Sequence, residues 1–511
     1  MDNEHIIIPK QPDLDILLVS IPRLSVEVPP SSIAILKPNL INAGFTCKCL
    51  DINIELYHEF TFEEWLEIDN YFQTDLRYTG NDTSGKQREI DFETMHVNKK
   101  EGLKVYKKYM DFLDRWTDIM LAKKPRWIGI SVFSVNSVLS SIDVCKMLRK
   151  KSPNTKILLG GMGVSAFGVA TRPNFGEYMK EVDLCDQYIS GEGEKAIVDI
   201  IKTEQPIFFN PQLDNLNDLP YADYGDFDFD KYPSENNLIY TTGSRGCVRS
   251  CTFCDIGNLW EKFRYRSGEN IAQEMLKAYE DYGTTEFYFT DSLINGNVKE
   301  FMVLCERLVY YKGNNRLPKE VSFGGQWICR PVKQFLEPRY QLASEAGLYN
   351  LSIGMESGSD DVLASMTKGV IQEDYDYQME MLYKYGIRCN FLMIIGYPTE
   401  TLKDFQATLD MFTRYKKYSD AGIVWGVNLG KTLVVLPGAP LGENPDHYGI
   451  DFDQKGNWIN KDIGLDYNER VRRRMAVQRH IESLGYVVKS TVTTINSLHE
   501  IVKSGGYDSI E

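Results

Sequence analysis

Two stretches of the chain alternate short apolar runs with segments of helical spacing, and this alternation limits the fold more than any other feature. The first stretch predicts strands at 14–21, 46–52, 127–133, 156–161 and 187–194, with helices at 31–45 and 139–151. Strands that alternate with helices are typical of a parallel sheet covered by helices. We therefore expect an α/β protein whose N-terminal domain is a Rossmann-like parallel sheet.

The second alternating stretch extends from about residue 236 to 440. It predicts strands at 238–247, 286–292, 321–328, 349–357, 388–396 and 431–437, and helices at 269–283, 298–313, 334–347, 376–386 and 402–416. These six β-α units are enough for a partial (β/α)6 barrel. In such a barrel the functional site lies at the C-terminal ends of the strands.

The length of 511 residues exceeds the ~250–300 at which one hydrophobic core usually stops growing, so several domains are expected. We predict a first domain at 1–205 with a polar, partly helical insertion at 60–124 that covers a neighbouring site. The segment 206–235 combines Pro, Gly, Asn and acidic residues and is predicted to be a linker. The barrel follows at 236–440, and 441–511 forms a mainly helical extension with helices near 467–485 and 493–506.

The composition predicts a globular protein, with 43% hydrophobic and 25% charged residues. The net charge is -15 and no basic stripe is present, so nucleic acid is not an expected partner. The Arg-rich segment 468–480 is predicted to be the solvated face of a helix. No secretory signal and no apolar stretch of ~18 residues is visible, which predicts a cytoplasmic protein without a membrane span.

Cys247, Cys251 and Cys254 are the only dense group among the ten cysteines, and they lie in the loop after the first barrel strand. The other seven stand among apolar neighbours and are predicted to be buried free thiols. A 4Fe-4S cluster usually takes four cysteines, one per iron, so three cysteines leave one iron open. A closed zinc site is the alternative, but it requires four ligands, and the loop contains no His and the chain no second CxxC.

The motif CxxxCxxC, with the aromatic Phe253 before its third cysteine, resembles the signature of the radical S-adenosylmethionine (SAM) enzymes. The resemblance implies a 4Fe-4S cluster bound by Cys247, Cys251 and Cys254. It also implies that the open iron binds the amino and carboxylate groups of SAM. An electron from the cluster would then cleave SAM to give the 5′-deoxyadenosyl radical.

Further segments resemble the same family in the same order. The segment 352–369 resembles the fourth-strand segment, which implies that Glu356 and Ser357 lie near the ribose or methionine part of SAM. The segment 391–401 resembles the fifth-strand segment, whose backbone at Ile395 and Gly396 meets the adenine, and 434–441 resembles the segment after the sixth strand. At the second strand the usual Gly-Gly-Glu type motif is replaced by "YFTDSLINGN", where Asp291 is placed to face the cofactor.

The N-terminal half resembles the cobalamin-binding domain of one large radical SAM subgroup, in the segments 28–45, 127–131, 157–163 and 188–194. The resemblance implies that Ser131 and the turns with Gly160, Gly161 and Gly191 contact cobalamin. Taken alone, these glycines fit tight turns equally well. The DxHxxG motif that supplies a histidine ligand to cobalt is absent, which excludes that ligation mode. The alternative is a domain that has lost its cofactor.

These resemblances imply a radical SAM enzyme, and the commonest reaction of the subgroup is cobalamin-dependent methyl transfer. We expect a small-molecule or peptide substrate and an external electron donor of the flavodoxin or ferredoxin type. One alternative is a radical SAM rearrangement, cyclisation or thiolation without cobalamin chemistry. A non-enzymatic iron–sulfur redox or sensor protein is the other.

Overall fold

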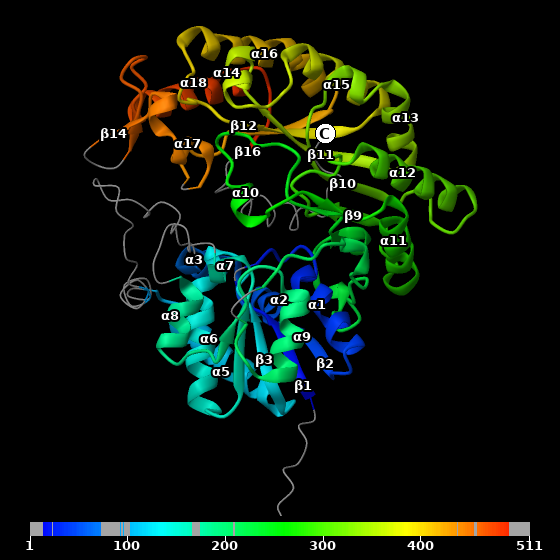
Figure 1. Ribbon diagram of the computed structural model, residues 1–511, viewed down its shortest axis with the longest axis vertical. Coiled ribbons are helices and arrows are strands. Elements are labelled where there is room, and N and C mark those ends of the chain that lie inside the picture. Colours follow the sequence, from blue (N-terminus) through cyan, green and yellow to red (C-terminus); the bar gives the residue numbers. More distant parts are fainter. Residues whose placement is uncertain are drawn as a thin grey trace, which may run out of the picture. The chain divides into compact units, whose positions relative to one another are not determined.

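The computed structural model describes residues 14–22, 24–72, 92, 96, 103–165, 174–207, 210–436, 438–453 and 457–489 (Figure 1). These residues form two compact units. Unit 1 holds the described residues up to 211 together with 219–232, and unit 2 holds 212–218 and the described residues from 233 onward. The helix predicted near 493–506 and the middle of the predicted insertion lie outside the described residues.

Unit 1 contains the predicted parallel sheet. Its strands are β1 (Leu14–Ser20), β2 (Cys47–Asp51), β3 (Pro125–Ser131), β4 (Lys156–Gly160) and β5 (Gln187–Tyr188). They pair in the order β2-β1-β3-β4-β5, and every pairing is parallel. From β1 the chain adds β2 on one side and β3, β4 and β5 on the other, so the order of strands reverses between β1 and β3. In open sheets, ligands bind beyond the C-terminal strand ends at such a point.

Helices connect these strands and cover the sheet. They are α1 (Ser31–Asn42), α2 (Ile52–Glu59), α3 (Phe62–Phe72), α5 (Tyr106–Ala122), α6 (Val138–Lys151), α7 (Met162–Ser165), α8 (Phe175–Glu181) and α9 (Gly193–Thr203), with short 3-10 turns at Val135–Ser137 and Phe229–Lys231. α1 contacts α9, and α5 contacts α6. The segment predicted as an insertion is therefore helical over α3 and α5.

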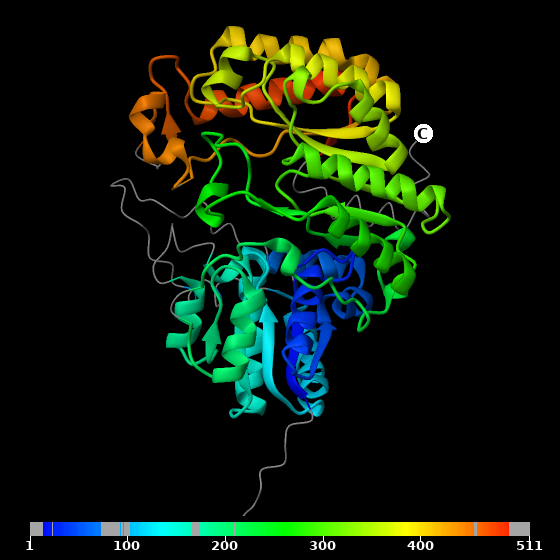
Figure 2. The ribbon, with the colours of Figure 1, turned by 45° about the vertical axis from the view of Figure 1, so that its right-hand side comes forward.

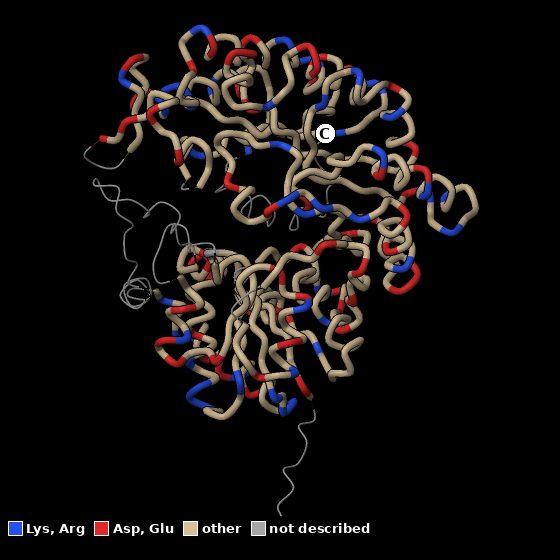
Figure 3. Tube along the Cα trace, viewed as in Figure 1, with Lys and Arg blue, Asp and Glu red and all other residues tan. Residues whose placement is uncertain are grey.

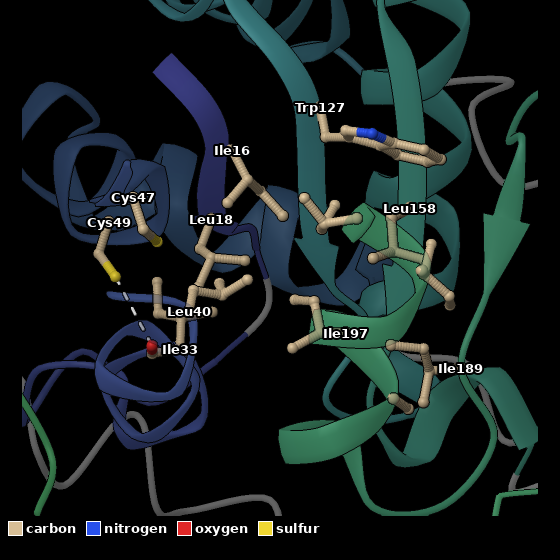
Figure 4. Close-up of a cluster of buried hydrophobic side chains, with 13 residues drawn as sticks. Ile16, Leu18, Ile33, Leu40, Cys47, Cys49, Trp127, Leu158, Ile189 and Ile197 are labelled. Atoms are coloured by element: carbon tan, nitrogen blue, oxygen red, sulfur yellow. Dashed lines mark hydrogen bonds between the residues drawn. The ribbon is translucent and has the colours of Figure 1, made fainter. Parts of the chain in front are cut away.

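Buried side chains from β1, β2, α1 and α9 form a core on one face of this sheet (Figure 4). Cys47 and Cys49 are two residues apart on β2 and point to the same face, as the alternation of a strand requires. The Cys49 thiol donates a hydrogen bond to the carbonyl of Ile33 at 3.6 Å. The seven cysteines outside the dense group are all buried, which confirms their prediction as buried thiols.

Unit 2 contains the predicted incomplete barrel. Its strands are β6 (Ile239–Thr241), β9 (Glu286–Phe289), β10 (Ser322–Trp327), β11 (Leu348–Glu356), β12 (Arg388–Met393), β13 (Val424–Asn428) and β16 (Val488–Lys489). They form one sheet in the order β16-β13-β12-β11-β10-β9-β6, with parallel pairing throughout. Two small antiparallel pairs accompany it, β7 (Ser244–Arg245) with β8 (Arg264–Tyr265), and β14 (Asp451–Phe452) with β15 (Trp458–Ile459).

One predicted strand is wrong. The sixth strand lies at β13, and the predicted strand at 431–437 follows it as irregular chain in which residue 437 is not described. Its apolar residues have another use, because Leu433 and Val435 pack against a buried cluster that includes Tyr397 and Leu441. The short strand β16, which the sequence did not predict, pairs with β13 at the edge of the sheet.

The helices of unit 2 alternate with its strands (Figures 1 and 2). They are α10 (Ile256–Leu259), α11 (Gly268–Tyr282), α12 (Val298–Gly313), α13 (Glu337–Ala346), α14 (Asp360–Ser365), α15 (Gln372–Tyr385), α16 (Leu402–Asp420), α17 (Pro440–Glu443) and α18 (Tyr467–Ser483), with 3-10 turns at Leu216–Asp218, Glu235–Asn237, Val332–Gln334 and Pro445–Tyr448. Local signals fix several ends. Thr401 and Asp404 form a capping box at the start of α16, and α11 ends at Gly283, which has a φ of 68°.

The extension after residue 440 adds α18 and β16 to the barrel. The prediction that the Arg-rich segment 468–480 is only a solvated face is wrong, since Arg470 and Arg473 are 2% and 4% exposed. Both side chains point into unit 2, where Arg473 lies 3.0 Å from Glu400. Within the described part of the chain, no helix is long and apolar enough to cross a membrane.

Candidate metal and cofactor site

The cysteine loop, residues 247–254, begins directly after β7 at the C-terminal end of β6. Gly246 has a φ of +88°, and a Cβ there would lie 2.9 Å from the carbonyl oxygen of Lys262, so the turn into the loop requires glycine. The backbone amide of Cys254 donates to the carbonyl of Cys251 at 3.0 Å. The amide of Arg249 donates to the thiol sulfur of Cys247 at 3.4 Å.

The three cysteines are partly exposed, unlike the other seven. Burial raises the pKa of the Cys251 thiol, and burial raises the pKa of Cys254 to about 11. Both thiols are therefore protonated at neutral pH when no metal is bound, and coordination to a metal would deprotonate them. The chemistry of this donor set fits an iron–sulfur cluster.

No three His, Cys, Asp or Glu side chains in the described ranges are arranged to hold a single metal ion. The thiolates of one zinc ion converge, because each sulfur lies about 2.3 Å from the metal. A 4Fe-4S cluster gives each cysteine an iron of its own, so its thiolates are spread around a larger body. The number of cysteines in the loop fits the cluster, because three leave one iron open.

A second loop, residues 366–369 after α14, holds the cysteine loop in place. The amide of Thr252 donates to the carbonyl of Met366 at 3.2 Å, and the Thr367 hydroxyl donates to the carbonyl of Ser250 at 3.3 Å. The Thr252 hydroxyl also forms a 2.7 Å hydrogen bond with the hydroxyl of Tyr397. These hydrogen bonds attach the cysteine loop to the loop after α14 and to Tyr397.

Phe253 and Arg249 add two further anchors. Phe253, the aromatic residue of the motif, is partly buried and packs against the cluster that contains Met366, Tyr397 and Leu441. The guanidinium of Arg249 donates to the carbonyl of Cys329 at 3.1 Å, just after β10. The cysteine loop is thus attached to the loops that follow three other strands.

Glu356 forms a buried ion pair at the end of β11. Its carboxylate lies 3.0 Å from the ammonium of Lys368, and the two side chains are 10% and 11% exposed. A register shift between Gly354 and Glu356 precedes the pair, and Glu356 has a φ of 60°, which is strained for a residue with a side chain. Such strain is typical of functional positions.

Lys368 is a site residue that sequence reasoning missed, although it stands in the segment 352–369 that resembles the fourth-strand segment of the family. Burial lowers its pKa, but the adjacent carboxylate of Glu356 outweighs burial and raises it. Lys368 therefore remains a cation close to the cysteine loop. Its charge favours the thiolate of Cys251 and would attract a carboxylate bound beside the cluster.

Asp291 is buried and holds the base of the cysteine loop. Its carboxylate accepts hydrogen bonds from the amide of Gly243 at 2.8 Å and from the hydroxyl of Ser244 at 2.6 Å. Burial raises its pKa to about 7. Both carboxylate oxygens are occupied, which makes Asp291 a positioning residue for the loop in this structure. Its neighbour Thr290 is exposed and bonds the hydroxyl of Thr242 at 3.0 Å.

The other predicted SAM contacts are buried against protein. The hydroxyl of Ser357 is fully buried and lies 3.4 Å from that of Thr408 on α16. The side chain of Ile395 is buried, and Gly396, with a φ of 76°, donates its amide to both carboxylate oxygens of Glu400 at 3.2 Å. Ser357, Ile395 and Gly396 thus lie at the ends of β11 and β12, as predicted, and their contacts with SAM stay predictions.

Glu400, like Lys368, is a residue near the candidate site that the sequence analysis did not predict. It is fully buried, burial raises its pKa to about 7, and Arg473 of α18 is its ion-pair partner. Arg470 packs on the same loop, since a Cβ on Gly396 would lie 2.8 Å from it. The loop after β12 is therefore shaped by side chains of the C-terminal extension.

In unit 1 the predicted residues follow the strands β3, β4 and β5. The hydroxyl of Ser131 lies 3.1 Å from that of Ser32 in the first turn of α1, at the point between β1 and β3 where the order of strands reverses. Gly160 ends β4, and no atom lies within 4 Å of a Cβ placed on it. Phe133 and Met162 near the same strand ends are 46% and 47% exposed. Among the described residues, this edge leaves space at Gly160 and exposes two apolar side chains beside the serine hydroxyls.

Two of the predicted glycines serve the fold itself. Gly161 has a φ of +107°, and a Cβ there would lie 2.6 Å from the carbonyl oxygen of Val132. Gly191 has a φ of +89°, in the left-handed region that favours glycine. A Cβ on Gly191 would meet only the side-chain nitrogen of Asn210 at 3.5 Å, so of the three glycines only Gly161 is crowded by backbone.

Residues 241–412 match the family model described as the radical SAM superfamily. The chain contains a radical SAM domain. The match extends from β6 to α16 and includes the cysteine loop, the Glu356–Lys368 pair and the loop after β12. It confirms the prediction drawn from the cysteine motif, and the 4Fe-4S cluster and SAM are the cofactors of this family.

Curated relatives of the radical SAM domain are distant. A methyltransferase of Pyrococcus horikoshii, described as uncharacterised, is 23% identical over 313 residues, which cover 56% of this chain and 63% of that protein. The anaerobic magnesium-protoporphyrin IX monomethyl ester cyclase of Cereibacter sphaeroides is 23% identical over 333 residues, which cover 59% of this chain and 52% of that protein. The chain therefore spans between about half and two thirds of the length of these relatives.

A solved structure matches beyond the radical SAM domain. The radical SAM methyltransferase TsrM of Kitasatospora setae, with tryptophan substrate and a SAM analogue bound, has a TM-score of 0.63 at 15% identity, over 92% of this chain and 89% of that one. The likeness includes unit 1 and shows that the α/β fold of the whole described chain is one known among radical SAM enzymes.

Proposed function

We propose that this protein is a radical SAM methyltransferase that uses a 4Fe-4S cluster, SAM and cobalamin. The observation that supports this proposal most strongly is the cysteine loop, which presents three partly exposed thiols at the rim of a parallel barrel. Three cysteines leave one iron of a cluster open to a second ligand. When bound, the cluster and SAM supply the 5′-deoxyadenosyl radical.

The residues around the loop suit the two ends of SAM. Cys247, Cys251 and Cys254 would hold the cluster. Lys368 is a buried cation next to Cys251 and would stabilise the methionine carboxylate, while the Glu356 carboxylate would accept hydrogen bonds from ribose or amino groups. Asp291 and the 366–369 loop would keep the thiols in position while the cluster changes charge.

The open edge of unit 1 supports cobalamin as the second cofactor. A corrin ring is large, flat and partly apolar, and the exposed Phe133 and Met162 offer apolar contacts beside Gly160, around which the described residues leave space. Ser131 and Ser32 offer hydroxyl groups at the same edge. A further TsrM structure holds cobalamin and a 4Fe-4S cluster, which makes cobalamin the first ligand to test.

The proposed substrate is a small molecule or peptide, because the TsrM structure holds tryptophan. Methyl transfer by this route also needs an electron for the cluster. We assign that electron to an external donor of the flavodoxin or ferredoxin type. The chain is proposed to work in the cytoplasm, where such donors are found.

A radical cyclisation is the second candidate function. It is favoured by the similarity to the anaerobic magnesium-protoporphyrin IX monomethyl ester cyclase, which aligns over a slightly larger share of this chain than the methyltransferase does. Both reactions begin with the same radical and require the same cysteine loop. They differ in whether a methyl group is added to the substrate.

The test is anaerobic purification, cluster reconstitution and incubation with hydroxocobalamin. We expect about one corrinoid per chain by mass spectrometry of the extracted cofactor, and 5′-deoxyadenosine after reduction in the presence of SAM. Deoxyadenosine without retained corrinoid would overturn methyl transfer and favour cyclisation or another radical reaction. A bound cluster that produces no deoxyadenosine would instead favour an iron–sulfur redox or sensor protein.

A further inference from the structure

An open groove lies on unit 2 beside the rim that carries the cysteine loop. Its lining comes from the first turns of α12, the 3-10 turn at Val332–Gln334 and the start of α13, and consists of Val298, Lys299, Met302, Val303, Glu306, Lys333, Gln334 and Arg339. α12 follows the loop after β9, and the 3-10 turn follows β10. Both segments therefore start at the C-terminal ends of barrel strands.

The groove carries cations that are not neutralised. Lys299 and Lys333 are exposed and form no ion pair or hydrogen bond with any residue in the described ranges. The guanidinium of Arg339 donates to the carbonyl of Gln334, and Glu306 is the single acidic residue of the lining. Three cations against one carboxylate make this surface locally positive.

Elsewhere on unit 2, surface lysines commonly have acidic partners. Lys277 pairs with Asp281, and Lys416 pairs with Asp420. Basic and acidic residues are interspersed over both units (Figure 3). Because the chain as a whole has a net charge of -15, an acidic partner is repelled by most of the molecule and attracted to this groove.

A bonded path leads from the groove to the cysteine loop. The side-chain oxygen of Gln334 accepts a hydrogen bond from Arg330 at 3.2 Å. The preceding residue, Cys329, accepts the 3.1 Å hydrogen bond of Arg249 through its carbonyl. The amide of Arg249 in turn donates to the sulfur of Cys247. A partner seated in the groove would thus be connected to a cluster ligand through a few residues.

The groove also has an apolar floor. Val298, Met302 and Val303 of the lining are partly buried, and Leu336, which lies in the chain between the lining residues Gln334 and Arg339, is 51% exposed. A small apolar patch with a charged rim is typical of transient interfaces, and electron-transfer complexes bury the least area among specific complexes. The surface fits a weak, fast-exchanging protein partner.

We propose that this groove docks the acidic electron-transfer protein that reduces the cluster, a protein of the flavodoxin or ferredoxin class. The inference rests on the proposed function and names the partner surface for it. In the step, the reduced donor loses one electron and the cluster gains it, passing from the 2+ to the 1+ state. With SAM bound, that electron would break a sulfur–carbon bond of SAM and give methionine and the 5′-deoxyadenosyl radical.

The experiment compares the reconstituted holoenzyme with the variant Lys299→Glu/Lys333→Glu/Arg339→Glu. Lys319→Glu is the matched control, since Lys319 is exposed and lies before β10, at the opposite end of that strand. Binding of an oxidised acidic flavodoxin is measured by titration calorimetry at low salt. Deoxyadenosine formation is measured separately with reduced flavodoxin and with titanium(III) citrate, a small reductant that needs no docking surface.

We expect the triple variant to weaken flavodoxin binding and to slow the flavodoxin-driven rate by roughly tenfold or more, because three charge reversals remove the electrostatic attraction. The titanium-driven rate and the Lys319→Glu variant should match the wild type. Added salt should slow the wild type and leave the triple variant nearly unchanged.

Equal flavodoxin binding by the wild type and the triple variant, or no binding by the wild type, would overturn the groove as the docking site. A matching loss in the titanium-driven rate would also overturn it, because the substitutions would then act on the site itself. Failure of the wild type to form deoxyadenosine with titanium(III) would count against the proposed function. The binding titration would still decide on the groove. Competition by RNA for the groove would assign it to nucleic acid and overturn the protein partner.

Discussion

The C-terminal strand ends of the two units are built in opposite ways. In unit 1, the ends of β3 and β4 leave space at Gly160, which carries no side chain and has no described atom within 4 Å of a Cβ placed on it. In unit 2, the edge at β6 and β11 is filled by side chains that are held by other side chains, such as Asp291 and the Glu356–Lys368 pair. A ligand of unit 1 would occupy the space that glycine leaves. A cluster in unit 2 would instead be bound by a loop that side-chain hydrogen bonds and an ion pair hold in place.

This difference predicts different responses to mutation. Substitutions in unit 2 should remove ligands or leave buried charges without partners, so their effects should be large. Substitutions at Gly160 should obstruct a ligand without harming the fold. The following predictions test this contrast.

The largest effect is expected for Cys251→Ala, because each cysteine would bind its own iron and the loop offers no substitute thiol. We expect loss of most cluster iron after reconstitution, and deoxyadenosine formation at background level. Iron and sulfide analysis together with electron paramagnetic resonance would measure it. Cys305→Ala, at a buried thiol of α12, serves as the control and should keep its iron. Full cluster content in Cys251→Ala would remove this cysteine from the proposed site.

The next effect concerns the buried ion pair. Lys368→Met or Glu356→Gln leaves one buried charge without its partner and should lower the free energy of unfolding by about 3–5 kcal/mol. The double variant Glu356→Gln/Lys368→Met should recover much of that loss in urea unfolding. If the pair serves SAM as proposed, the double variant should still have a strongly raised KM for SAM. A normal KM would mean that the pair is purely structural.

Asp291 should make unit 2 sensitive to pH. Its pKa is raised from 3.8 to about 7, so between these values the folded state binds more protons than the unfolded state. The stabilisation is therefore complete below pH 3.8 and is lost as the pH rises through about 7, by up to about 4 kcal/mol. Urea unfolding at pH 5 and pH 8 should show Asp291→Asn gaining stability relative to the wild type as pH rises. A constant difference between the two proteins would refute this role.

The smallest effects separate the two adjacent glycines of unit 1. Gly160→Leu should weaken corrinoid binding by about tenfold, which corresponds to about 1.4 kcal/mol, while the melting temperature changes little. Gly161→Ala should destabilise the unit by about 1–3 kcal/mol, because of its positive φ and the nearby carbonyl of Val132. Equilibrium dialysis with hydroxocobalamin and thermal unfolding measure the two quantities. Unchanged dialysis for Gly160→Leu would indicate that the open edge does not hold the corrin.

Much of the fold could be predicted from the sequence, because strands that are buried on both faces are continuous apolar runs. The strands β1, β3 and β4 lie where 14–21, 127–133 and 156–161 were predicted. The error at β13 has a physical cause. Both 424–428 and 431–437 are short apolar runs next to a turn, and only tertiary pairing with β12 decides which one joins the sheet.

The candidate site divides in the same way. Cysteine spacing is a local signal, so Cys247, Cys251 and Cys254 could be identified from the sequence. Lys368, Glu400 and Arg473 could not, because their importance comes from partners that are brought together only by folding. Asp291 was identified, but its hydrogen bonds to Gly243 and Ser244, 48 and 47 residues earlier in the chain, could not be foreseen.

The strand β16 has a consequence for synthesis on the ribosome. The chain emerges from its N-terminus, and the barrel strand β13 receives its outer neighbour only when residues 488–489 have been made, about 60 residues later. Arg473, which pairs with Glu400 in the loop after β12, also arrives late. During this interval a nascent barrel exposes one unpaired strand edge and one unpaired buried acid. The growing chain is therefore most open to unwanted strand pairing during this interval.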